Sequence, residues 1–146
     1  MAGFKLLRDD NDKGAKSLPV VSIAVAVGDL LELLVGAVSW TAVTASSNFF
    51  SRKAVALAAC TSSATEVLCF ECDGTETFEV ESANNSDVLH NGDRMIATDV
   101  NTVNNTGTDN TSQNAVFIQD GVIGAAADKR ITGRVLVGNG VDPDAS

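Results

Sequence analysis

The sequence predicts an all-β fold, a small β-barrel or β-sandwich of about eight to ten short strands with an extended N-terminal arm. Three observations support this prediction. Val, Ala, Thr and Gly are abundant, whereas Pro occurs only twice. Short apolar segments alternate with small or polar residues, as strands with a buried face do. Turn signals recur about every ten residues, a spacing typical of sandwiches and barrels.

The chain of 146 residues suits a single domain. Such a chain can bury about two-thirds of its unfolded surface without disulfides or metals. We divide it into an arm over residues 1–17, a β-rich domain over residues 18–141 and a C-terminal tail over residues 142–146. The arm is charged and lacks a hydrophobic period, and its apolar anchors are Phe4, Leu6 and Leu7.

The domain begins with alternating apolar residues that predict a strand over residues 18–27, followed by a turn at Gly28-Asp29. The segment LLELLV, residues 30–35, fits either a strand or a single helical turn. We favour the strand because the segment is short for a helix. The Ala-rich stretch 53–59 is predicted as a strand, although its propensity also allows a helix. Further strands are predicted within residues 37–45, 93–100 and 130–140, with a strand pair broken at Asp120-Gly121 within residues 115–126.

A β-hairpin is predicted over residues 66–81, with Asp73-Gly74 as its turn. A three-residue loop would set Phe70 opposite Phe78 on an apolar face and leave the glutamates on the other face. A two-residue loop would instead place two glutamates opposite each other, at a cost of a few tenths to about 1 kcal/mol. We therefore favour the three-residue loop.

Two features concern the connections between strands. Gly92-Asp93 repeats the Gly28-Asp29 pattern, and both pairs are interpreted as turns that lead into strands. Gly supplies unusual backbone angles there, and Asp caps the turn through its side chain. The polar tract 101–114 is rich in Asn and Thr and predicts a long exposed loop or flap.

The charge is unevenly distributed along the chain. The net charge is −9, yet residues 1–16 sum to +1 and the rest of the chain to −10. So acidic a body repels phosphate backbones, and we expect no nucleic-acid partner. Asp29 and Glu32 interrupt the most apolar stretch, so we expect no transmembrane helix. The N-terminus turns acidic almost at once, which argues against a secretory leader.

No motif predicts catalysis, a cofactor or a metal site. Cys60, Cys69 and Cys72 are expected as free thiols, and the last two should point to opposite faces of a strand. His90 is the only histidine and lacks a nucleophile and an orienting group beside it. Scattered acids form no calcium-loop pattern; they are Asp87, Asp93, Asp99, Asp109 and Asp120. We expect a protein that is not an enzyme.

Three segments of the chain carry a resemblance to a known group of proteins. They are residues 25–30 (VAVGDL), residues 53–58 (KAVALA), where Ala54 replaces a Gly of the group, and residues 131–136 (ITGRVL). On these segments the chain, over residues 20–137, resembles the small decoration, or cement, proteins of tailed-bacteriophage capsids.

The resemblance implies a β-rich subunit on the outer capsid surface of a virion, assembled in the host cytoplasm. Its partners would be the major capsid protein and further copies of itself in a homotrimer. The arm would reach an adjacent subunit, with docking by Phe4, Leu6 and Leu7 and pairing of Lys5 and Arg8 with shell carboxylates. A flexible tail is the alternative for the arm. Alternatives for the whole chain are a phage tail or neck structural protein, a ligand-binding β-sandwich module and an enzyme.

Overall fold

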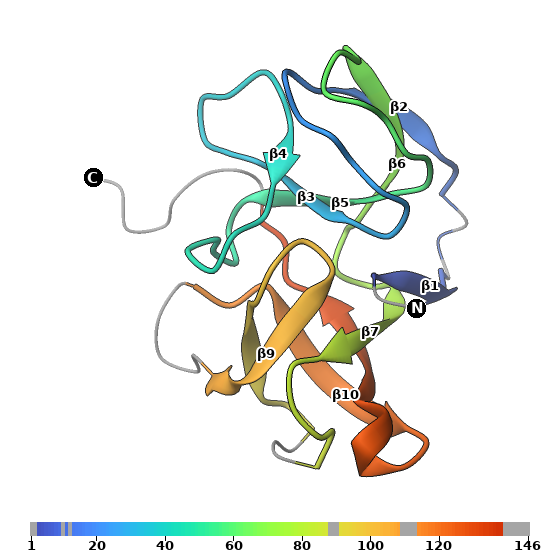
Figure 1. The fold of residues 1–146 in the computed structure, drawn as a ribbon, viewed down its shortest axis with the longest axis vertical. Coiled ribbons are helices and arrows are strands. Elements are labelled where there is room, and N and C mark those ends of the chain that lie inside the picture. Colours follow the sequence, from blue (N-terminus) through green and yellow to red (C-terminus); the bar gives the residue numbers. More distant parts are fainter. Residues whose placement is uncertain (1–2, 10, 12, 88–90, 109–113, 139–146) are drawn as a thin grey trace.

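The computed structural model describes residues 3–9, 11, 13–87, 91–108 and 114–138. Within these residues the chain is almost entirely β, which confirms the predicted fold class. Figure 1 shows two stacked lobes, which we call the upper lobe (β2–β6) and the lower lobe (β1 and β7–β11). The strands are β1 (Lys5–Arg8), β2 (Lys16–Pro19), β3 (Leu30–Leu33), β4 (Thr41–Ala42), β5 (Arg52–Ala56), β6 (Glu66–Glu71), β7 (Thr77–Ser82), β8 (Arg94–Ala97), β9 (Thr102–Thr108), β10 (Phe117–Ile123) and β11 (Arg130–Val135).

Each lobe contains one curled sheet. The lower sheet has the order β1-β7-β11-β10-β8-β9, and a parallel pairing of β9 with β7 closes its last five strands into a ring. The upper sheet has the order β2-β6-β5-β3-β4. An isolated bridge between Val20 and Trp40 brings its two edges together. Both lobes are therefore barrel-like.

The central strands β3 and β5 of the upper sheet are buried on both faces, because they separate two hydrophobic cores. Side chains of β3 alternate between them: Leu30 packs into the lower core and Leu31 into the upper core. Val55 of β5 faces the lower core, and its neighbours Ala54 and Ala56 face the upper one. Period-two geometry thus explains why these strands are nearly continuous apolar runs. It also confirms the strand interpretation of the LLELLV segment.

The predicted hairpin over residues 66–81 is wrong. Its two halves are strands, but β6 pairs with β2 and β5 in the upper lobe, whereas β7 pairs with β1 and β11 in the lower lobe. Phe70 and Phe78 do meet, with ring centroids 6.3 Å apart, as core residues contributed by the two lobes. The chain does change direction at Asp73-Gly74, as predicted, and Gly74 has φ +88°. A turn signal does not specify which strands pair.

Three further predictions need correction. The strand predicted over residues 18–27 corresponds to β2, which ends at Pro19; beyond it residues 20–27 form only isolated bridges. The tract 101–114 forms strand β9 instead of an exposed loop, since Val103 is buried in the lower core; residues 109–113 lie outside the described part. The predicted strand pair at 115–126 is one strand, β10, with a bulge between Gln119 and Gly121.

The N-terminal segment is part of both sheets instead of an extended arm. Its residues 5–8 form β1 on the edge of the lower sheet, and Lys16 begins β2 in the upper sheet. Phe4 is buried and contacts the rings of Phe78 and Phe117, with centroids 6.4 and 5.9 Å away. The chain's own core thus binds the predicted anchor. The predicted C-terminal tail, residues 142–146, lies outside the described residues.

The two Gly-Asp turns differ in their surroundings. Gly28 has φ +92°, and a Cβ placed on it would lie 3.1 Å from the Gly3 Cα atom. Asp29 caps this turn by accepting a hydrogen bond from the Ala26 N–H at 2.9 Å. Gly92 has φ +94° with open space around it. The first turn therefore permits a close backbone contact between the lobes, whereas the second serves only the change of direction.

Candidate functional site

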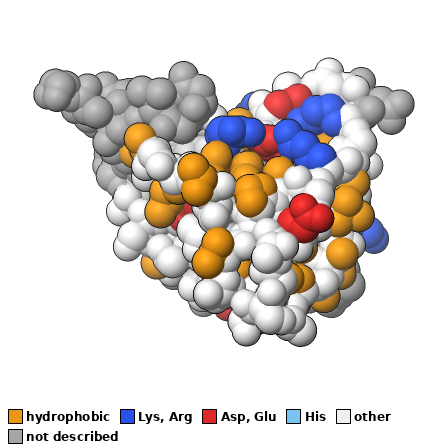
Figure 2. Space-filling model, turned by 90° about the horizontal axis from the view of Figure 1, so that it is seen from above, with side chains coloured by type: hydrophobic (Ala, Val, Ile, Leu, Met, Phe, Trp, Pro, Cys, Tyr) orange, Lys and Arg blue, Asp and Glu red, His pale blue; other side chains and the backbone are white. Residues whose placement is uncertain are grey.

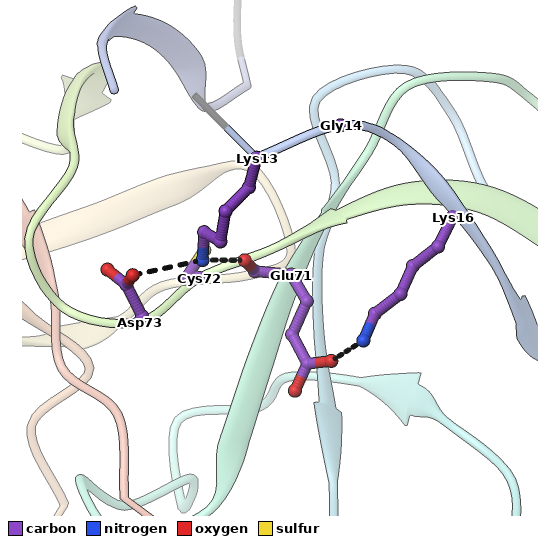
Figure 3. A pocket seen from close by; sticks show the side chains of 6 residues that line it. All are labelled: Lys13, Gly14, Lys16, Glu71, Cys72 and Asp73. Carbon is purple, nitrogen blue, oxygen red and sulfur yellow. Dashed lines mark hydrogen bonds and ion pairs between the residues drawn. The ribbon is translucent and has the colours of Figure 1, made fainter. Parts of the chain in front are cut away.

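A charged cleft lies where the chain crosses between the lobes (Figure 3). The cleft has a volume of about 400 Å³. One wall comes from the link between β1 and β2, and the other from the end of β6 and the crossover that follows it. Its lining residues are Lys13, Gly14, Lys16, Glu71, Cys72 and Asp73.

Lys13 is the centre of this cleft. Its Nζ donates to the Glu71 carbonyl oxygen at 2.6 Å and forms ion pairs with Glu76 at 2.8 Å and Asp73 at 3.3 Å. The ammonium also lies 5.1 Å from the ring centroid of Phe70. Partial burial lowers the pKa of Lys13, but the two carboxylates outweigh it and raise this pKa above 10.5. Lys13 therefore ties the β1–β2 link to the β6–β7 crossover.

Glu71 binds the other cation of the cleft, Lys16, and also Arg52, which lies beside the cleft on β5. Arg52 donates to it twice, from Nε at 2.8 Å and from Nη2 at 3.0 Å, and the Lys16 ammonium pairs with the same carboxylate. Burial raises the pKa of Glu71, but the bonds from Arg52 and Lys16 outweigh it and lower this pKa below its usual value. Arg52 also lies over the ring of Trp40, 5.5 Å from its centroid. The cleft's cations and carboxylates thus neutralise one another.

The cysteines behave as the sequence predicts. Cys69 packs in the upper core and Cys72 in the lower core, so the two thiols face opposite ways. Burial raises the pKa of Cys69 to about 11 and that of Cys72 well above 9. Neither thiol ionises near neutral pH, so neither provides a thiolate nucleophile. Within the described residues, all three cysteines are free, and no group of His, Cys, Asp and Glu is arranged to hold a metal ion.

A second polar cluster, built on strands β3 and β5 of the upper lobe and the loop before β5, is buried, and sequence reasoning missed it. Lys53 is fully buried, and its Nζ donates to the Asn48 carbonyl at 2.7 Å, the Ser51 carbonyl at 3.1 Å and the Ser51 Oγ at 2.7 Å. Ser51 in turn donates to Glu32 at 3.0 Å, and Ser47 donates to the other oxygen of that carboxylate. Burial lowers the pKa of Lys53 to about 8, against the opposing charge of Glu32.

The Ser51–Lys53 contact has the composition of a nucleophile–base pair. Ser51 is almost fully buried, however, and its hydroxyl already donates to Glu32. The Lys53 ammonium has an acceptor for each of its three protons. This arrangement is that of a satisfied structural network. The sequence signal for it was a charged residue inside each of two apolar strands, Glu32 in β3 and Lys53 in β5.

The structure separates the predicted contact residues of the N-terminus. Phe4 is buried, Leu6 is half-buried, and the side chains of Lys5, Leu7 and Arg8 are exposed. Of the scattered acids, Asp120 lies 3.8 Å from Arg134, and Asp99 accepts the Asn101 N–H at 2.9 Å. Asp87 and Asp93 lie near turns and are not gathered into a site. His90 and Asp109 fall outside the described residues.

Three comparisons with known proteins were negative. No protein-family model, curated protein or solved structure matches the chain. In the part of the chain that the structure describes, no helix has the length and apolarity needed to cross a membrane. The fold, its surface and its side-chain chemistry are therefore the basis for a functional proposal.

Proposed function

We propose that the protein is a structural virion protein, which binds the outside of a bacteriophage head and stabilises the shell of major capsid protein. The observation that carries this proposal is the distribution of exposed apolar side chains on an acidic protein. Figure 2 looks onto the upper end of the molecule, where hydrophobic side chains gather beside a group of Lys and Arg. Large exposed hydrophobic residues are Leu7, Val21, Val27, Leu34, Val35, Val38, Leu57, Leu68 and Val122.

The loop between β3 and β4 is the most concentrated of these surfaces. Residues 34–38 read LVGAV and carry no charge. Val38 is 85% exposed and Val35 is 57% exposed. Contiguous exposed apolar residues mark interaction sites in proteins that are otherwise soluble. We assign this loop to the contact with the shell, and the acidic remainder of the surface to solvent.

The charged cleft supports a structural role over an enzymatic one. Its cations and carboxylates are engaged with one another and with main-chain groups. A catalytic group needs a pKa near the working pH and access to substrate. Lys53, with a pKa of about 8, is fully buried. Binding across an interface needs neither property.

The proposal includes self-association on the head as a homotrimer. A specific interface buries about 1,600 Å² in total. Many copies on one shell add avidity to contacts that are individually modest. Light scattering of the purified protein gives its mass in solution, and a trimer mass is expected.

Co-sedimentation with head shells of the cognate phage, stripped of accessory proteins, tests the proposed function. The wild-type protein should pellet with the shells, and Val38→Asp should weaken binding at least 10-fold because it places a charge in the apolar contact. Val122→Asp is the matched control, since Val122 is likewise an exposed valine, at 51%, but lies on β10 of the lower lobe. A protein that stays in the supernatant would contradict the proposal, and labelling confined to the tail or neck would favour that alternative.

A further inference from the structure

An apolar groove of about 270 Å³ separates β1 from the upper lobe. Its floor is made of the rings of Phe4, Phe70 and Phe78, which belong to the lower core. Leu6 of β1 forms one wall, and Val27 with the end of β5 forms the other. Val27 is 55% exposed at the rim. The three rings are at most 4% exposed, so the surface that the groove offers to a side chain from outside is the apolar surface of Leu6, Val27 and Leu57 above them.

Strand β1 contributes a free edge next to this groove. It is the edge strand of the lower sheet, and its ladder partner is β7. The hydrogen bond from the Phe4 N–H to the Gly28 carbonyl, at 2.8 Å, fixes the start of β1. Among the described residues, no backbone hydrogen bond outside the ladder involves Lys5, Leu6 or Leu7. An edge strand beside an apolar groove is the arrangement that accepts an added strand.

Charge indicates what kind of segment fits. Lys5 is exposed and lines the groove, and no ion pair joins it to another described residue. The groove's lining contains no carboxylate. Within the described residues the ammonium thus has no ion pair, although Glu79 lies opposite Lys5 in the β1–β7 ladder and the net charge of the chain is −9. A segment that brings an Asp or Glu to this end of the groove gains an ion pair.

Resting on the proposed function, we propose that the groove and the free edge of β1 bind an extended segment of the major capsid protein. The segment adds antiparallel or parallel to β1 as a new strand. Its alternate apolar side chains enter the groove, and a carboxylate pairs with Lys5. The four residues of β1 span about 13 Å, so four or five residues of the partner are engaged.

A second copy of this chain fits the groove less well. The exposed apolar loop at residues 34–38 has no carboxylate for Lys5. Charge complementarity therefore favours a segment of a different protein over self-association at this edge.

Hydrogen exchange of the shell-bound protein, followed by mass spectrometry, tests this inference. Amides of residues 5–8 should exchange at least 10-fold more slowly on shells than in free protein. Shell binding that leaves these amides unchanged overturns the groove inference and leaves the proposed function standing. Absence of shell binding overturns both. Concentration-dependent protection of residues 5–8 in free protein overturns the assignment to a shell segment, because it identifies a second copy as occupant.

Two pairs of variants sharpen the test. Val27→Asp should weaken shell binding at least 10-fold by placing a carboxylate at the rim, whereas Val122→Asp should not. Lys5→Glu should weaken binding by a similar factor, whereas Lys5→Arg should retain it because the cation remains. All three positions are exposed, so circular dichroism should show unchanged folding for the four variants. Equal binding by Lys5→Glu and Lys5→Arg would count against the assigned ion pair.

Discussion

Two lysines of this protein occupy contrasting sites. Lys53, in the upper lobe, is fully buried and bonded to neutral oxygens, and it meets Glu32 only through Ser51. Lys13, between the lobes, has a side chain that is 32% exposed and touches two carboxylates directly. The pKa of Lys53 falls to about 8, whereas that of Lys13 rises above 10.5.

The difference shows that direct contact with a carboxylate decides whether the pKa of a partly or fully buried lysine rises or falls. Desolvation is the largest influence on both ammonium groups, and it disfavours the charged form in each. Direct contacts with carboxylates reverse the outcome for Lys13. Lys53 has hydrogen bonds instead, which satisfy its protons without cancelling its charge. Substitutions in the buried Lys53 cluster should therefore lower the free energy of unfolding more than substitutions in the charged cleft around Lys13.

The largest effect is expected from Glu32→Ala. It removes the carboxylate whose charge favours the buried Lys53 ammonium and leaves the Ser47 and Ser51 hydroxyls without their acceptor. Losing one member of a buried charged network costs about 3–5 kcal/mol. Urea denaturation measures the free energy of unfolding. Glu66→Ala, at an exposed position of the same lobe, should change it by less than about 0.5 kcal/mol; similar losses in both variants would contradict the contrast.

The second-largest effect is expected in the pH dependence of stability, because the pKa of Lys53 differs between the folded and the unfolded chain. Its pKa is about 8 in the folded protein against 10.5 ordinarily, so between these values the unfolded chain binds more protons. Stability should therefore rise with pH across this window, by up to about 3 kcal/mol from this group. Ionisation of the cysteines opposes the rise, because their pKa values are raised in the folded state.

A Lys53→Met variant separates the two influences, since it keeps the cysteines and removes the lysine. Wild type should gain stability relative to this variant between pH 8 and 10.5. The Lys53 Cε resonance in wild-type spectra gives the same answer without a substitution, by titrating near pH 8. A midpoint near 10.5 would remove the distinction between the two lysines.

An intermediate effect is expected from Glu76→Ala in the cleft. The Glu76 carboxylate accepts the Asp73 N–H at 3.0 Å and pairs with Lys13. Its loss leaves the N–H without this acceptor, at about 1–3 kcal/mol. Lys13 keeps Asp73 and the Glu71 carbonyl, which limits the damage. Glu76→Gln retains an acceptor and should lose less in the same urea titration; a loss as large as that of Glu32→Ala would erase the comparison.

The smallest effect is expected from Lys16→Ala. The Lys16 side chain is 53% exposed, and Glu71 keeps both bonds from Arg52 without it. Exposed ion pairs contribute about 0–1 kcal/mol. The urea midpoint should therefore stay close to that of wild type, and the small difference should shrink further at 1 M salt. A loss above about 2 kcal/mol would show that this pair is more than a surface contact.

Strand existence could be predicted more reliably than strand pairing. The apolar runs at β3, β5 and β11 identify strands because side-chain alternation is local. The Asp73-Gly74 turn suggested a hairpin, yet the glutamate three residues after Asp73 turns inward to Lys13 and the chain passes to the other lobe. Pairing depends on contacts between residues far apart in sequence, which a local pattern does not contain.

For the candidate sites too, the sequence indicated the residue types but not the surfaces that these residues contact. The apolar residues near the N-terminus were recognisable as anchors, but their role depended on which surface they meet, and Phe4 meets the chain's own core. The buried position of Lys53 was not expected, since lysine is rarely buried without a carboxylate partner. Tract 101–114 was expected to be exposed because of its polarity, whereas Asn105 is buried with hydrogen bonds to the main chain of residues 84 and 85.

The sequence by itself determined that this protein is all-β, acidic and built on short strands, because composition and alternation are properties of neighbouring residues. It also placed the turn at Gly28, where only a residue without a side chain permits the approach of Gly3. The tertiary structure alone decided that β3 and β5 lie between two hydrophobic cores and are buried on both faces, and that β1 leaves a free edge beside an apolar groove. Those features arise from long-range pairing, which only the folded chain establishes.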